Sequence, residues 1–191
     1  MRFTRNKQLV FVLILVVGAV VVWLFSRNDS PPIRINADTS IKTTRVAPSN
    51  FQYPSGWTEA KQIPIADSRA GVIAEAKHNN PTASLVLSSV PGSLTSGTSI
   101  NKLASQTVDK LKTESIDFSL LSSSIVNIGG NKAIDIVFSS SSGGQIYTEN
   151  QFIVPTNQTT YFLTLSVQQT AYPKLSSTVE QLPTSLASYL K

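Results

Sequence analysis

An unbroken apolar run near the start of the chain limits the possible folds more than any other feature. Residues 9–25, LVFVLILVVGAVVVWLF, contain no charged side chain. As a helix they would extend about 25 Å, close to the roughly 30 Å hydrocarbon core of a bilayer. Moving this helix into lipid is favourable by roughly 4 to 8 kcal/mol, which favours the membrane over a protein core. The run therefore predicts one transmembrane helix whose partner is the lipid bilayer.

A cleaved signal peptide is the alternative for this segment. Hydrophobic regions of signal peptides run about 7–15 residues and end at a small-x-small site. The run at 9–25 is longer, and the following WLFSRNDS offers no such site. We therefore expect a permanent anchor, although the sequence leaves cleavage open.

The basic residues indicate the orientation of the anchor. The tail at residues 1–8 holds three basic side chains and no acid, whereas Arg27 and Arg34 follow the apolar run. The positive-inside rule favours a cytoplasmic tail, and the residues on the far side weaken that bias. We expect the domain to be extracytoplasmic, in a single-pass protein of the cell membrane. A cytoplasmic domain tethered to the inner face is the alternative.

Charge and cysteine content exclude several functions. The net charge of +5 comes mostly from the four basic residues before residue 28; after them, twelve basic and eleven acidic side chains nearly cancel. Nucleic-acid binding needs several Lys or Arg on one face, and no such cluster appears, so we expect no nucleic-acid partner. Without cysteine there are no disulfides, thiol nucleophiles or thiolate metal sites.

The rest of the chain divides into a linker and one folded domain. Residues 26–48 are rich in Pro, Asn, Asp, Ser and Thr and predict a linker, in which 33–45 could hold one edge strand. Residues 49–191 are long enough for a single domain with its own core.

Six later runs in the domain have the composition of strands. They lie near 70–78, 83–90, 117–127, 131–140, 145–154 and 159–168. HNNPT, NIGGN, SSSSGG and PTNQT supply turns between consecutive strands. Alternation at Ile134, Ile136 and Phe138 predicts a sheet with one buried face and one wet face.

Two stretches have helical spacing of apolar residues. The first covers 99–113, with Ser99 as its N-cap. The second runs from about 172 to the end; Pro173 suits its first turn, and Pro183 should kink or split it.

The opening of the domain, FQYPSGW, predicts a further strand. Phe51 and Tyr53 would point to one face, Pro54 would end the pairing, Gly56 would permit a turn, and Trp57 would fill the core. The predicted fold is α+β, an antiparallel sheet of about six or seven strands packed with helices and preceded by one transmembrane helix.

These features together resemble a known family. YPSGW near the domain start, the helix at 99–113, the hairpin NIGGNKAIDIVF and the closing helix are similar to those of PsbP-like domains, named for a subunit of the photosynthetic oxygen-evolving complex. The resemblance covers about residues 49–191. It implies an α/β/α sandwich, also found in a nuclear-import factor and in bacterial envelope proteins, that acts in binding or assembly. It carries no catalytic residues, and metal ligands reported in photosynthetic members match no positions here.

No residue pattern points to catalysis. His78 is the only histidine and is expected in an exposed turn. Ser99 and Lys102 match the S-x-x-K spacing of penicillin-recognising enzymes, but the other motifs of those enzymes are missing, so a helix cap and a surface lysine explain the pair. The closest acids, Asp109, Glu114 and Asp117, are expected on a solvated surface.

The remaining motifs are assigned to turns. Gly129–Gly130 and Gly143–Gly144 show no phosphate-loop spacing. Asn157-Gln158-Thr159 fits the N-glycosylation pattern, but a turn also explains it. We therefore expect no catalytic, cofactor-binding or metal-binding residues, and the residues that bind a partner stay unknown.

The sequence predicts a membrane-anchored, non-catalytic PsbP-like domain that mediates protein interaction or assembly at the cell envelope. Recognition would use the exposed sheet face or the loop at 91–98. A small-ligand or metal-binding envelope domain is the main alternative. A hydrolase with a cryptic Ser or Asp site and a spacer that regulates a neighbouring membrane protein are two others.

Overall fold

The computed structural model describes residues 43–44, 50–60, 63–64, 71–95 and 97–191. The tail, the transmembrane helix predicted at 9–25 and almost all of the predicted linker lie outside these residues. Within the described part of the chain, no helix has both the length and the apolar character to cross a bilayer.

Seven antiparallel strands form the main sheet, in the order β2-β4-β5-β9-β8-β7-β6. Their bounds are β2 Thr58–Glu59, β4 Gly71–Asn79, β5 Thr82–Pro91, β6 Ser119–Ile128, β7 Asn131–Ser142, β8 Gln145–Pro155 and β9 Thr159–Gln168. The six strands predicted from residue 70 onward are confirmed to within two residues at every end. Two short strands, β1 (Thr43–Thr44) and β3 (Ile63–Pro64), pair separately.

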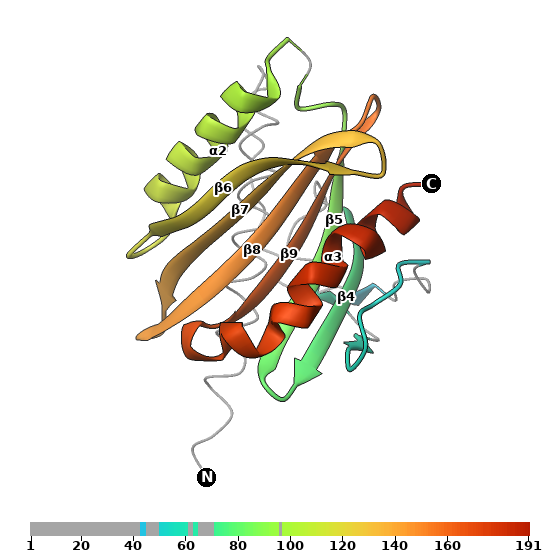
Figure 1. The fold of residues 1–191 in the computed structure, drawn as a ribbon. Helices are drawn as coiled ribbons and strands as arrows, with labels where there is room; N and C mark the ends of the chain where they lie inside the picture. The colour runs from blue at the N-terminus through green and yellow to red at the C-terminus, as the bar shows by residue number, and fades with distance from the viewer. Residues whose placement is uncertain (1–42, 45–49, 61–62, 65–70, 96) are drawn as a thin grey trace.

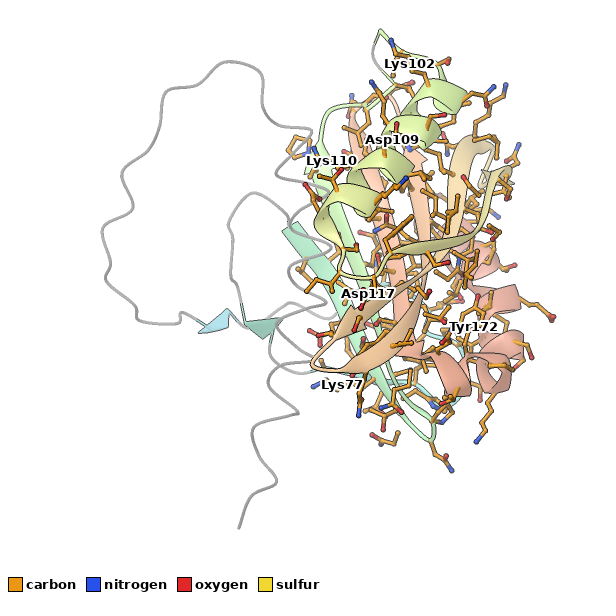
Figure 2. All side chains as sticks on the ribbon, turned by 90° about the vertical axis from the view of Figure 1, so that its left-hand side faces the viewer. Lys77, Lys102, Asp109, Lys110, Asp117 and Tyr172 are labelled. Atoms are coloured by element: carbon orange, nitrogen blue, oxygen red, sulfur yellow. The ribbon has the colours of Figure 1, made fainter. Side chains whose placement is uncertain are left out.

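One helix lies on each side of this sheet, which gives the predicted α/β/α sandwich (Figures 1 and 2). Helix α2 (Ile100–Glu114) packs over β6 and β7. Helix α3 (Ser176–Tyr189) follows the 3-10 helix η1 (Gln169–Leu175) and crosses the opposite face. We refer to the two sides of the sheet as the α2 face and the α3 face.

Both faces of the sheet contain core residues, so the prediction of one wet face is wrong. On the α2 face, Ile134, Ile136 and Phe138 pack with Leu103 and Leu111 of α2. The α3 face carries a larger apolar cluster, which includes Leu85, Phe152, Leu163, Leu165, Leu182 and Leu186. Alternate residues of one strand thus enter different cores, and both can be apolar when helices cover both faces.

The strand predicted at the domain start is not formed. Residues 50–54 have no regular secondary structure, and pairing begins only at β2. Phe51 is buried, with its ring centroid 5.3 Å from that of Tyr53 and 6.1 Å from that of Tyr189. The segment therefore packs its rings against the end of α3 instead of joining the sheet.

The turn and the tryptophan predicted after this segment are present. The Trp57 N–H donates to the Pro54 carbonyl at 3.4 Å, and Gly56 has a φ of +85°. The Trp57 side chain contacts the α3-face core but is only half-buried. Its indole N–H donates to Thr178 Oγ1 at 3.4 Å, which ties the turn to α3.

Pro183 does not split the closing helix, as the sequence had suggested it could. Helix α3 continues as one element past this residue. Leu182 and Leu186 on either side are fully buried. Their burial, about 2 kcal/mol each, offsets the hydrogen bond that proline cannot donate.

Candidate functional site

The α2 face of the sheet changes character from one side to the other. Under α2 it is apolar, with Ile134, Ile136 and Phe138 of β7 at its centre. Beyond β7, on β8, β9, β5 and β4, polar residues take the equivalent positions. We call this region the polar strip; it consists of Glu149, Gln151, Thr164, Ser166, Ser84, Glu75 and Lys77.

Cross-strand pairing fixes the layout of the polar strip. In the first row, Glu149 pairs with Ser166, Ser166 with Ser84, and Ser84 with Lys77. Direct partners share a face, with Cβ atoms about 5 Å apart. Each row therefore runs laterally across four strands.

The second row lies two residues along each strand. Gln151 pairs with Thr164, Thr164 with Val86, and Val86 with Glu75. The Gln151 amide donates to Thr164 Oγ1 at 3.1 Å. The two rows together place seven polar side chains on one continuous surface.

Several polar atoms of the strip are buried without a hydrogen-bond partner among the described residues. They are Glu149 Oε2, Gln151 Oε1 and Ser84 Oγ. Glu149 and Gln151 are at most 1% exposed. An orphaned buried acceptor costs about 1–3 kcal/mol, and native proteins normally satisfy such atoms with water, a ligand or a partner. The strip is therefore short of donors.

The electrostatics of the strip centre on Glu149. Burial raises the pKa of its carboxyl from 4.5 to about 7, and the hydrogen bond that Ser140 Oγ donates to Oε1 at 3.3 Å partly opposes this. Burial also raises the pKa of Glu75, while the charge of Lys77 lowers it. A donor brought to Glu149 would stabilise its charged form.

A smaller polar group lies on the α3 face. The Asn150 amide donates to Asp135 Oδ1 at 2.6 Å, and Tyr172 of η1 lies on this side of the sheet (Figure 2). Burial raises the pKa values of Asp135 and Tyr172. Asn150 Oδ1 is the one buried side-chain atom of this group without a partner in the described part of the chain. The polar strip, with three such atoms, is the stronger candidate.

The structure explains most residues that the sequence singled out as structural. Ser99 caps α2 as predicted, because its Oγ accepts from the Lys102 backbone N–H at 3.2 Å. Asp109, Glu114 and Asp117 are exposed as predicted, although burial raises the pKa of Glu114. The acids thus form no paired site.

His78 differs from its prediction in position and exposure. It lies in β4 next to the turn and is half-buried. Its Nδ1 is 2.9 Å from the Pro81 carbonyl oxygen, and its ring centroid is 5.4 Å from that of Trp57. Within the described ranges, no group of three or more His, Cys, Asp or Glu side chains is arranged to hold a metal ion.

Sequence reasoning did not identify Glu149 or Gln151. A signal was present: residues 148–151, Thr-Glu-Asn-Gln, place four polar side chains in the middle of a strand. On a two-sided strand such a run puts polar groups into both layers. The alternation of polar and apolar residues along a strand identifies a buried face only when the other face is exposed. It therefore could not identify these residues, because helices cover both faces of this sheet.

Comparison with known proteins identifies the fold. No protein-family model matches the chain, and no curated protein matches it in sequence. Solved structures with a similar fold include the following three. LpqN of Mycobacterium tuberculosis, involved in cell envelope biogenesis, has a TM-score of 0.51 and 18% identity, covering 75% of this chain and 88% of its own. Cyanobacterial PsbP from Synechocystis has a TM-score of 0.50 and 14% identity, covering 82% of this chain and 98% of its own.

The third is a protein of unknown function from Pseudomonas aeruginosa, with a TM-score of 0.50 and 16% identity over 65% of this chain and 92% of its own. None of the three is described as an enzyme. At these identities the likeness shows the fold and nothing finer. The antiparallel seven-stranded sheet between two helices is a PsbP-like fold, as the sequence features had indicated.

Proposed function

We propose that the chain is a membrane-anchored, non-catalytic PsbP-like domain that binds a protein partner at the cell envelope. The partner enters the polar strip from its exposed Lys77 end, since the other side chains of the strip are buried. The observation that carries the proposal is the set of orphaned atoms at Glu149, Gln151 and Ser84. Gln151 Oε1 can only accept, and Glu149 Oε2 accepts when the carboxyl is ionised, so the matching surface supplies N–H or O–H donors. An arginine or lysine side chain, or a free backbone amide, has this chemistry.

The envelope location rests on two supports. The apolar run at 9–25 is long enough to span a bilayer. The structural neighbour LpqN is itself involved in cell envelope biogenesis. The anchor predicts that the full chain stays in the pellet after a carbonate wash of membranes, and that deletion of residues 9–25 releases it. Protease added to intact cells should digest the domain if it is extracytoplasmic.

Site-specific photo-crosslinking tests the binding surface. A benzoylphenylalanine at Lys77, the exposed end of the polar strip, should give one defined protein adduct in intact cells. The control is the same probe at Lys132, which is exposed on β7 and should give no such protein adduct. Gln151→Leu, which removes the acceptor at similar volume, should abolish the adduct. Equal adducts at both positions, or none at Lys77, would contradict the proposal.

The small-ligand alternative uses the same orphaned atoms and predicts a different result. A free amine or guanidinium compound would occupy the strip without any protein adduct at Lys77. It would raise the melting temperature of the full chain, since it binds only the folded state. Gln151→Leu should remove that shift.

A further inference from the structure

Among the residues that the structure describes, no strand pairs with the outer edge of β6, which also carries exposed apolar side chains. All of its ten residues except Val126 and Ile128 are exposed. Leu121 is 51% exposed and Ile125 is 39% exposed. At the opposite edge of the sheet, β2 has two residues, so β6 is the longer of the two edge strands among the described residues (Figure 1).

This edge lacks most of the features that prevent the edge strands of natural proteins from pairing with other chains. Sequence SLLSSSIVNI contains no lysine, no other charged residue and no proline. Charged side chains, proline and bulges normally protect an edge from pairing with another chain. One irregularity occurs between Leu120 and Ser122, and the following stretch, Ser122–Ile128, pairs with β7 in unbroken register. A regular, uncharged edge of seven residues is thus available.

The hairpin to β7 determines which backbone groups point outward. Ile128 pairs with Asn131 across a two-residue turn at Gly129 and Gly130, both with positive φ. The residues flanking such a turn form a hydrogen-bonded pair, and pairs then alternate along the ladder. Ile128, Val126 and Ser124 therefore direct their N–H and C=O groups toward β7. Asn127, Ile125 and Ser123 direct theirs outward.

These outward groups match a second copy of the same strand. In an antiparallel pairing about a two-fold axis at Ile125, this residue faces its own copy in a hydrogen-bonded pair. Ser123 then faces Asn127 twice, so a hydroxyl meets an amide on either side of the apolar centre. A charged strand that paired with its own copy would bring like charges together, which is unfavourable. Because β6 carries no charge, its self-pairing has no such cost.

We propose that β6 mediates homodimerisation by antiparallel pairing over Ser122–Ile128, with the two-fold axis at Ile125. The two sheets become one continuous sheet across the interface. This contact lies at the β6 edge, whereas Lys77 lies on β4 near the other edge of the sheet, so the contact does not depend on the proposed function.

Single-cysteine crosslinking of the full chain in membranes tests the register directly, because the natural chain has no cysteine. Ile125→Cys should form a disulfide-linked dimer, since opposed Cα atoms in such a pair are about 5.5 Å apart. Leu121→Cys is the matched control: this position is more exposed than Ile125, but its two copies would lie roughly 27 Å apart along the strands. It should form no disulfide-linked dimer.

A charge variant tests whether the contact exists without a crosslink. Ile125→Lys opposes two ammonium groups and should halve the mass of the detergent-solubilised protein measured by light scattering, whereas Ile125→Val should keep the dimer. If Ile125→Lys does not fold, the cysteine pair still decides. A monomeric wild type, equal crosslinking at 121 and 125, or an adduct at 125 with a different protein would each overturn the proposal.

Discussion

Glu149 shows how one residue links the sheet to a measurable property. Its carboxyl lies on a central strand with Phe138 and Ser166 as its cross-strand neighbours. Ser140 supplies one hydrogen bond to Oε1, and Oε2 has no partner among the described residues. Burial therefore disfavours the ionised form of this carboxyl, which raises its pKa to about 7.

This pKa predicts a pH dependence of stability. Because the folded state raises the pKa from 4.5 to about 7, it holds a proton that the unfolded chain releases. The free energy of unfolding should therefore fall as pH rises from 4.5 to 7, by on the order of 3 kcal/mol. Glu149→Gln should flatten most of this fall. Urea unfolding of the full chain in detergent between pH 4.5 and 8 measures it.

The exposed acid Asp109 provides the control for that experiment. Asp109→Asn removes one carboxylate from the exposed surface of α2 and so serves as the matched change of charge (Figure 2). Glu75 and Asp135, whose pKa values are also raised, add smaller slopes of the same sign. An unchanged pH profile in Glu149→Gln would show that this carboxyl is not desolvated.

Gly56 gives a second prediction for a single residue. Its φ of +85° is unfavourable for other residues, and a Cβ there would lie 3.1 Å from His78 Nε2. Gly56→Ala should destabilise the domain by about 1–3 kcal/mol. The neighbouring Ser55→Ala, at an exposed position, should change stability little. The melting temperatures of the two variants are compared. Equal values would mean that Gly56 does not adopt the positive φ of this turn.

Among the helices, α2 owes its start to a local signal. Ser99 accepts from the Lys102 backbone N–H, and Leu103, Ala104, Thr107 and Leu111 then bury one side of the helix. Ser99→Ala should cost about 1 kcal/mol, whereas Ser99→Asp should keep most of the stability, because aspartate caps as well as serine. Thermal unfolding separates the two.

Element positions could be read from the sequence because local chemistry specifies them. Gly129 and Gly130 mark the β6–β7 hairpin through positive φ, and Ser99 marks a helix start. The layering could not be read in the same way. Ala133 and Ile134, adjacent in sequence, enter opposite cores, and that depends on helices whose placement is a tertiary property.

The candidate site was missed for a related physical reason. Glu149 pairs with Ser166, and Ser166 with Ser84, although these residues are far apart in the sequence. No local pattern reports such a row, since it exists only when β8, β9 and β5 lie side by side in this register. The run Thr-Glu-Asn-Gln within β8 was the one accessible sign.

At the scale of the whole molecule, two cores share one sheet. Phe152 and Ile153 are consecutive in β8, yet Phe152 belongs to the α3-face cluster and Ile153 to the α2-face cluster. A strand that unfolds removes its side chains from both cores at once. The sheet therefore couples α2 to α3, although the helices lie on opposite sides.

This coupling predicts one cooperative unfolding transition for the domain. Leu111→Ala in α2 and Leu182→Ala in α3 each remove a fully buried side chain and should each cost about 2–5 kcal/mol. With Trp23→Phe as background, fluorescence reports only Trp57, which contacts the α3-face core. Leu111→Ala should still shift the Trp57 transition as far as it shifts the circular dichroism transition, because loss of the α2 core releases the shared strands. If Leu111→Ala moved the circular dichroism curve and left the Trp57 curve in place, the two faces would be independent units and the sheet would not join them.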